Sequence, residues 1–86
     1  MQVRIELGQG SFIVYIPKEQ APDYQGRMQT GRGREVTVRG LSGYGAERVP
    51  ETGSPAVLRW YEDGIEYVLA GPLPLSEYLR MAESMP

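Results

Sequence analysis

The chain has 86 residues, of which 41% are hydrophobic and 23% are charged, and its formal net charge at pH 7 is -2. This composition is typical of one small folded domain and excludes a disordered chain or a membrane span. The acidic balance argues against a general polyanion binder. Because the chain contains neither histidine nor cysteine, it also lacks the commonest general base, the thiol nucleophile and the soft metal ligands.

Residues 2 to 7 alternate polar and apolar side chains and residues 12 to 16 are apolar, which predicts two strands joined by a tight turn at Gln9-Gly10, with the second face only half polar. This turn sets a register that pairs apolar residues: Leu7 with Phe12, Ile5 with Val14, and Val3 with Ile16. Since all six then share one face, we expect strands over residues 2 to 7 and 12 to 16. The proline at position 17 ends the second strand because it cannot donate to a ladder.

Residues 17 to 34 are rich in Pro, Gln, Gly and Arg and show no hydrophobic period, so we expect a long mobile loop. Its end presents two guanidiniums between glycines, Arg32 and Arg34, which is a candidate anion-binding loop. The loop lacks the helix and the lysine of a phosphate loop, and no basic face extends it. A solvated loop is therefore the simpler interpretation, and nucleic acid is not a favoured partner.

The middle of the chain is less regular. Residues 35 to 39 alternate and predict a short strand with Val36 and Val38 inward. The glycines at positions 40, 43 and 45 indicate turns. An edge strand over residues 46 to 49 is one open interpretation. Residues 51 to 55 are expected to form an exposed loop.

The last third of the chain carries the strongest signal. Two apolar runs, residues 56 to 62 and 65 to 70, flank Asp63-Gly64, the signature of a hairpin with a type I′ turn. That turn places Trp60 opposite Tyr67 and gathers the large apolar side chains on one face. A terminal helix over residues 76 to 85 should follow, with Ser76 as N-cap. Its apolar stripe consists of Leu75, Tyr78, Leu79, Ala82 and Met85.

Residues 57 to 85 resemble a bacterial domain of unknown function. The resemblance rests on a Leu-x-Trp strand, a Gly turn and a Tyr-x-Leu strand that lead into a helix ending Ala-Glu-Ser. The matching residues are the run 58 to 69, then Gly71, Leu75, Ser76, Leu79 and Ala82-Glu83-Ser84. Residues 35 to 49 fit the family's preceding strand and turn, whereas residues 18 to 34 carry no matching motif.

The resemblance implies a location and a setting. Domains of this family lie at the C-terminal, extracytoplasmic end of membrane-anchored anti-sigma factors and of proteins similar to the outer-membrane lipoprotein carriers. By resemblance alone, we therefore expect an extracytoplasmic module tethered to the membrane through a parent segment not in this chain. We expect residues 1 to 86 to form a single domain, and a fragment of a larger membrane-anchored protein remains an open alternative.

Catalysis is the function that the residues support least. The remaining candidates are carboxylates such as Glu62 and Asp63, but neighbouring strand residues point to opposite faces. A catalytic site needs converging groups with perturbed pKa values, and the serines beside glycines have no base to activate them. We expect no enzyme, no cofactor and no metal site.

The aromatic residues give two further candidates. A core, or an apolar pocket between sheet and helix, would be lined by Val14, Trp60, Tyr67 and Leu79. On the opposite face, an interaction patch would consist of Arg4, Tyr15, Arg59 and Tyr61, because Tyr and Arg are enriched at binding hot spots.

The expected fold is α+β, with a curved antiparallel sheet of about five strands packed against one C-terminal helix. The function most consistent with the residues and the resemblance is a non-catalytic module that senses or binds a protein partner and regulates its parent. The alternatives are a carrier of a lipid or another apolar ligand between sheet and helix, and weak anion binding through Arg32 and Arg34. A homodimer formed by pairing of edge strands also remains open.

Overall fold

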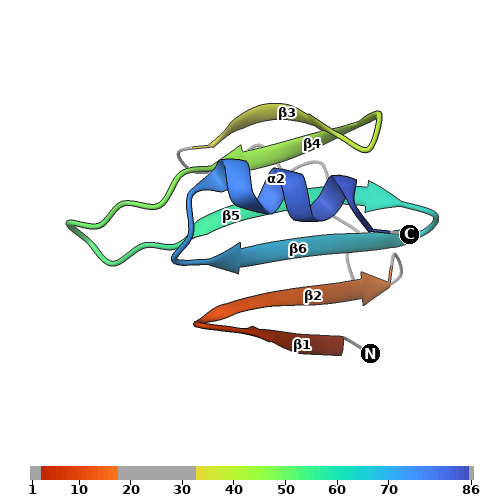
Figure 1. Cartoon of the computed structure of the whole chain (residues 1–86). Helices are drawn as coiled ribbons and strands as arrows, with labels where there is room; N and C mark the ends of the chain where they lie inside the picture. The colour runs from red at the N-terminus through yellow and green to blue at the C-terminus, as the bar shows by residue number, and fades with distance from the viewer. Residues whose placement is uncertain (1–2, 18–32, 86) are drawn as a thin grey trace.

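The computed structural model describes residues 3–17 and 33–85, which form one open antiparallel sheet of six strands and one helix (Figure 1). The elements are β1 (Val3–Gly8), β2 (Ser11–Pro17), β3 (Arg34–Val38), β4 (Leu41–Ala46), β5 (Ala56–Glu62), β6 (Ile65–Gly71) and α2 (Leu75–Glu83). The sheet order is β1-β2-β6-β5-β4-β3. The predicted α+β class and antiparallel sheet are confirmed, with six strands rather than about five. The predicted loop over 17 to 34 lies almost entirely outside the described residues.

The β5–β6 hairpin has the predicted register. Its turn residues Asp63 and Gly64 adopt φ angles of 54° and 80°, as a type I′ turn requires. Trp60 consequently pairs with Tyr67, and their rings stack with centroids 5.0 Å apart and planes 7° from parallel. The Asp-Gly turn and the apolar residues on either side thus agree on one register.

The predicted register of the β1–β2 hairpin is wrong beyond its first pair. Gly8 pairs with Ser11 as expected, but Leu7 is the extra residue of a β-bulge, and Glu6 then pairs with Phe12. Further along the hairpin, Ile5 pairs with Ile13 rather than with Val14. A bulge inserts one residue into one strand only, so every later pair is displaced by one position.

The displaced register changes which face of β2 meets the helix. Ile13 packs in the main core with Tyr15 against it, whereas Ile16 and Val14 pack with Val68 on the other face of the sheet. Ile13 and Ile16 are both buried, so β2 is apolar on both sides. Periodicity cannot identify the core face of such a strand.

Strand β4 was not predicted from the sequence. Its glycines were predicted to mark turns, but two of them lie in the strand and face the helix side of the sheet. A Cβ on Gly45 would come within 2.8 Å of a methyl carbon of Leu75, and one on Gly43 within 2.9 Å of the Arg59 carbonyl oxygen. The glycines are thus needed for close packing. The expected strand over 46 to 49 is reduced to an isolated bridge between Val49 and Ser54.

Helix α2 begins one residue earlier than expected and is capped differently. Pro74 occupies the N-cap without a side-chain bond, and the predicted cap Ser76 lies exposed inside the helix. The backbone N–H of Leu75 donates instead to the carboxylate of Glu47, at 3.1 Å. The helix ends at Glu83, before the predicted Met85.

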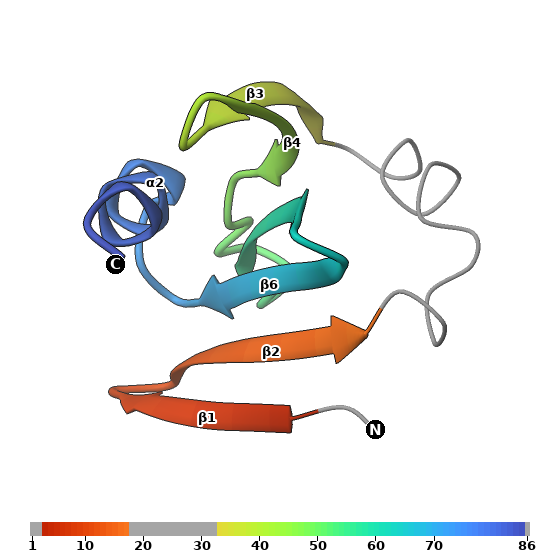
Figure 2. The ribbon, with the colours of Figure 1, turned by 90° about the vertical axis from the view of Figure 1, so that its right-hand side faces the viewer.

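The helix covers only part of the sheet. It packs over β5 and the β3–β4 hairpin, and its buried residues meet a core dominated by Trp60. The residues that α2 buries are Leu75, Tyr78 and Ala82. Figure 2 shows that β2 and β1 continue the curved sheet past the helix. The helix-side face of β1 is therefore left without a covering element among the described residues.

Candidate functional site

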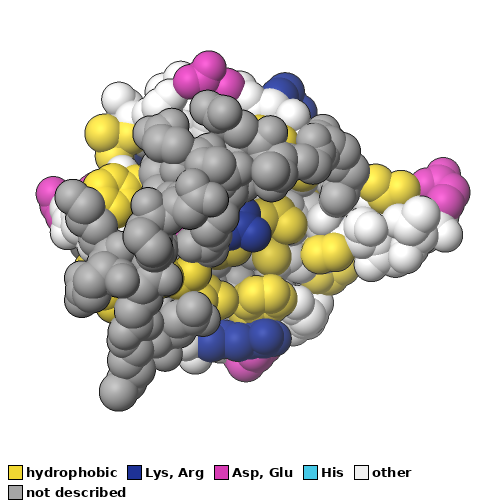
Figure 3. All heavy atoms as spheres, turned by 180° about the vertical axis from the view of Figure 1, so that it is seen from behind, with side chains coloured by type: hydrophobic (Ala, Val, Ile, Leu, Met, Phe, Trp, Pro, Cys, Tyr) yellow, Lys and Arg dark blue, Asp and Glu magenta, His cyan; other side chains and the backbone are white. Residues whose placement is uncertain are grey.

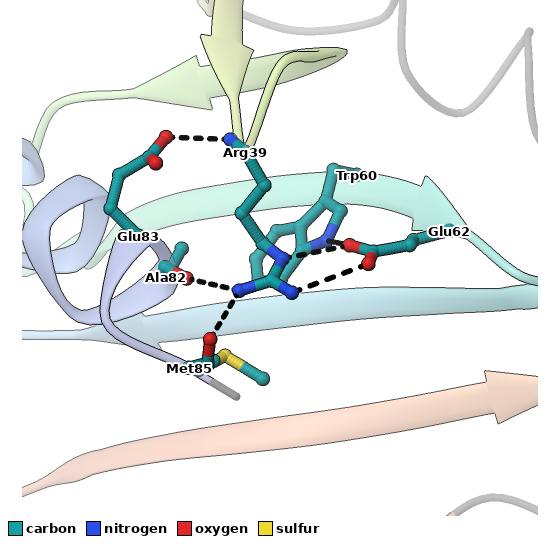
Figure 4. Close-up of polar contacts among 6 residues, drawn as sticks. All are labelled: Arg39, Trp60, Glu62, Ala82, Glu83 and Met85. Atoms are coloured by element: carbon teal, nitrogen blue, oxygen red, sulfur yellow. Dashed lines mark hydrogen bonds and ion pairs between the residues drawn. The ribbon is translucent and has the colours of Figure 1, made fainter.

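The most connected polar side chain is Arg39, in the turn between β3 and β4 (Figure 4). Its Nε donates to Glu62 at 2.9 Å, and its Nη1 donates to the carbonyl oxygens of Ala82 at 3.0 Å and Met85 at 2.7 Å. Glu62 also accepts from the indole of Trp60, at 3.1 Å. The guanidinium thus satisfies carbonyls at the C-terminus of α2, which identifies this cluster as a structural anchor.

This anchor should make the fold sensitive to acid. The hydrogen bond from Arg39 holds the pKa of Glu62 below its ordinary value of 4.5, and the same bond raises the pKa of Arg39. A carboxyl with a lowered folded-state pKa contributes stability that is present above pH 4.5 and is lost as the pH falls through the folded value. We expect the melting temperature to fall across that window, and to fall less in Glu62→Gln. Identical pH profiles for the two proteins would contradict this role.

A second buried polar contact joins β2 to α2. The hydroxyl of Tyr78 lies 2.8 Å from that of Ser11 and accepts from the backbone N–H of Leu73 at 3.2 Å. Ser11 and Tyr78 are both buried. Gly71 lies directly beside them, and a Cβ there would meet the Cα of Ser11 at 2.8 Å as well as the phenol oxygen. This group fixes the end of β6 against the start of the helix.

The four residues of the predicted interaction patch do not come together. Arg59 and Tyr61 lie on β5 and face away from the helix, but β6 and β2 separate them from Arg4 on β1. Tyr15 points to the opposite face, where its ring meets that of Tyr67 edge-on at 5.2 Å. Arg4 lies over the ring of Phe12 instead, 3.9 Å from its centroid. Figure 3 shows the molecule from the side opposite to the helix, where hydrophobic side chains lie beside Lys or Arg side chains.

Arg59 belongs to a polar contact of this same face. Its Nη1 donates to Glu66 at 3.4 Å, and the Glu66 side chain is fully buried while that of Arg59 is 29% exposed. Of the predicted anion loop, Arg34 is exposed at the start of β3, and Arg32 lies outside the described residues.

The residues predicted to line a pocket or core also divide between the two faces. Trp60 is fully buried in the main core, and Tyr67 and Leu79 pack against it. Val14 packs on the other face, because the bulge displaced its register. Around Trp60 the side chains of sheet and helix are closely packed, and Trp60, Leu75 and Tyr78 are fully buried.

An apolar groove lies elsewhere, between β1 and the C-terminal half of α2. It has a volume of about 300 Å³ and is lined by Leu7, Ile13, Tyr15, Leu69, Met81 and Met85. These six residues define what is called the apolar groove below. Next to Leu7, the same face of β1 carries two more apolar residues, Val3 and Ile5. Val3, Ile5 and Leu7 are 46%, 45% and 47% exposed, the largest exposures among the large hydrophobic residues of the described ranges.

One sequence feature is related to this groove, the apolar face of β1. The alternation of Val3, Ile5 and Leu7 with Arg4 and Glu6 predicted a strand with a buried face, which is the usual meaning of such a pattern. In the fold the strand extends past the helix, so its apolar face stays exposed. Only the lateral position of α2 reveals this, and periodicity carries no information about it.

A second hollow lies between the β1–β2 turn and the segment from Arg48 to Pro55. It is larger, at about 440 Å³, but glycine and proline form most of its lining. The Arg48 guanidinium at its border donates to the carbonyl oxygen of Pro72, at 3.0 Å. Because few side chains face this space, it offers little chemistry for recognition compared with the apolar groove.

Comparisons with known proteins add no relative. No family model matches the chain, and no curated protein or solved structure is significantly similar to it. Within residues 3–17 and 33–85, the acidic side chains form no cluster of three that could hold a metal ion. The same residues contain no helix with the length and apolarity needed to span a bilayer.

Proposed function

We propose that this domain is a non-catalytic protein-interaction module and that the apolar groove receives an apolar segment of a partner. The observation that supports the proposal most is the exposure of three apolar residues on the helix-side face of β1. Val3, Ile5 and Leu7 are each almost half exposed. Contiguous exposed apolar surface is uncommon on small soluble domains and marks interaction sites. These three residues are called the β1 strip below. Leu7 also lines the apolar groove, so the strip and the groove form one continuous apolar surface.

The lining of the groove suits a peptide or protein segment. One wall is formed by Met81 of the helix and by Met85 just past its end, and methionine side chains adapt to differently shaped partners because they are unbranched and polarisable. Its floor of Ile13, Tyr15 and Leu69 belongs to the packed sheet and is pre-organised. A flexible wall over a rigid floor is a suitable arrangement for binding an apolar segment.

The setting of the module is also a proposal. The resemblance of residues 57 to 85 to the extracytoplasmic domain supports a role in a membrane-anchored regulatory protein, outside the cytoplasm. In that role, occupation of the apolar groove by a partner would be the signal that the parent protein receives.

A second candidate function is binding of an acyl chain in the same groove. It is favoured by the six lining residues, none of which is charged, and by a volume at the lower end of the range for small-molecule sites. It is also supported by the position of the groove, which lies between Ile13 and Leu69 of the sheet and Met81 of the helix.

The test uses peptides selected on the full chain from a random display library, with the methyl NMR signals of Met81 and Met85 as reporters. We expect selected peptides to shift these two signals and to bind Met81→Glu at least about 10-fold more weakly. Leu41→Glu is the matched control, because Leu41 is also an exposed apolar residue but lies on the far hairpin. Equal loss in both variants, or peptides that leave both methyl signals unmoved, would contradict the proposal. Shifts obtained only with fatty acids would favour the second candidate.

A further inference from the structure

Strand β1 lies at an edge of the sheet, with apolar side chains on one face and charged side chains on the other. Within the described residues β1 has a strand neighbour on one side only, β2. Its helix-side face carries Val3, Ile5 and Leu7, and its other face carries Arg4 and Glu6. All six residues of the strand are exposed. An exposed edge of this kind can accept a further strand.

The five residues Val-Arg-Ile-Glu-Leu are complementary to themselves when two copies run antiparallel. If Ile5 of one copy lies opposite Ile5 of the other, Arg4 faces Glu6 and Glu6 faces Arg4, which gives two cross-strand ion pairs on one face. On the other face, Val3 lies opposite Leu7 on either side of the central isoleucines. Apolar groups thus meet apolar groups, and each charge meets its opposite.

The neighbouring registers lack this property. A slip that keeps the apolar face aligned must move the pairing by two residues, because side chains alternate with a period of two. Such a slip places Arg4 opposite Arg4, or Glu6 opposite Glu6, and like charges directly opposite each other are destabilising. The charges therefore select one register among those that the apolar residues allow.

From this complementarity we propose that two copies of the chain associate through β1, antiparallel and centred at Ile5. The result is a continuous sheet of twelve strands, six from each copy. The inference rests on the proposed interaction function and deepens it by naming a second copy as the partner of the β1 strip. The two-fold axis runs perpendicular to the sheet, so both helices lie on the same face.

The isolated chain keeps the same charges in a different pairing. Arg4 Nε now donates to Glu6 Oε2 within the strand, at 2.6 Å, with 56% and 63% of the two side chains exposed. In the dimer, Arg4 pairs with Glu6 of the second copy instead of with Glu6 of its own strand. Each of these charges therefore has an opposite charge beside it in the monomer and in the dimer. The paired region, called the β1 seam below, ends at Leu7, because the bulge there interrupts the regular edge of the strand. The seam is therefore short, and association depends on protein concentration.

The dimer places the two apolar grooves on one surface. Leu7 belongs both to the groove and to the seam, where it lies opposite Val3 of the second copy. Met81 and Met85 are not part of the seam and remain available above β2. A partner segment can then bind across two grooves related by symmetry, which strengthens binding when both are engaged.

Sedimentation velocity of the full chain from about 1 µM to about 1 mM tests the proposal. We expect a monomer–dimer equilibrium that either Arg4→Glu or Glu6→Arg weakens at least about 10-fold, since each makes all four charges of the seam alike. An equimolar mixture of the two variants should recover the dimer as a heterodimer, and so should the double variant R4E/E6R. Leu41→Glu, on the opposite side of the sheet, should dimerise like the wild type.

The outcomes separate this inference from the proposed function. A wild type that stays monomeric throughout, or single variants that dimerise as well as it does, would overturn the β1 seam. The same holds if the mixture of variants fails to recover the dimer. Peptide-induced shifts of the Met81 and Met85 methyl signals are measured on the same samples. If they persist without a dimer, only the seam is wrong, and if they are absent as well, both proposals fail.

Discussion

Replacing Trp60 with alanine is expected to lower the free energy of unfolding by about 3–5 kcal/mol, the usual cost of removing a large buried aromatic side chain. Trp60 is fully buried and belongs to the core that joins the sheet to α2. Its ring stacks on that of Tyr67, and its indole N–H donates to Glu62. The substitution therefore removes core volume, an aromatic contact and a donor to the helix anchor at once.

Thermal and urea unfolding measure this effect. A loss of that size corresponds to a melting temperature lower by roughly 15 °C or more for a domain of this length. Trp60→Phe keeps a ring in the core and loses the donor, so its cost should be clearly smaller. Leu41→Ala changes an exposed residue and should stay within about 0.5 kcal/mol of the wild type. A cost below about 1 kcal/mol for Trp60→Ala would show that the core is not organised around this ring.

Gly71→Ala is the second substitution with a large expected effect, about 1–3 kcal/mol. The added Cβ would come within 2.8 Å of the Ser11 backbone and would displace the hydroxyl of Tyr78 from the place where it meets Ser11. Neither the backbone nor a fully buried tyrosine can move freely. Urea unfolding of the variant should show a lower midpoint with an unchanged slope.

Two further variants isolate the cause of that loss. Gly53→Ala is a control for a Cβ at positive φ without a clash, because Gly53 has a φ of 74° and no atom lies within 4 Å of a Cβ built there. Gly71 has a φ of 157°, so the strain of its own backbone differs from that at Gly53. Tyr78→Phe removes the hydroxyl, which should reduce the additional cost of Gly71→Ala in the double variant. Strict additivity of the two substitutions would mean that the tyrosine hydroxyl does not transmit the effect.

The pairing register of the β5–β6 hairpin could be predicted to the residue because its determinants are local. Asp63-Gly64 is a turn with one favoured geometry, and the apolar residues on either side agree with only one register. In the first hairpin only β1 alternates, because β2 is apolar on both faces, and the bulge at Leu7 follows from backbone geometry that the pattern of apolar residues does not encode. The same local logic therefore succeeded in one hairpin and failed in the other.

The remaining errors have a common physical origin in contacts between distant residues. Gly43 and Gly45 indicate turns when viewed locally, and only the positions of Trp60 and Leu75 explain them as strand residues. The helix N-terminus is satisfied by Glu47, 28 residues away, so the local candidate Ser76 was not needed. The apolar groove depends on where α2 lies across the sheet, which no local pattern specifies.

The attachment of α2 at both ends has a consequence for the order in which the molecule folds. The helix has nine residues and is too short to persist alone in water. The N–H of Leu75 donates to Glu47, just after β4. Arg39, just before β4, donates to the carbonyl oxygens of Ala82 in the last turn and of Met85 just past the helix. The helix can therefore become stable only once the β3–β4 hairpin is in place. During refolding, we expect its amides to gain protection from hydrogen exchange after those of β5 and β6, which a local turn brings together early.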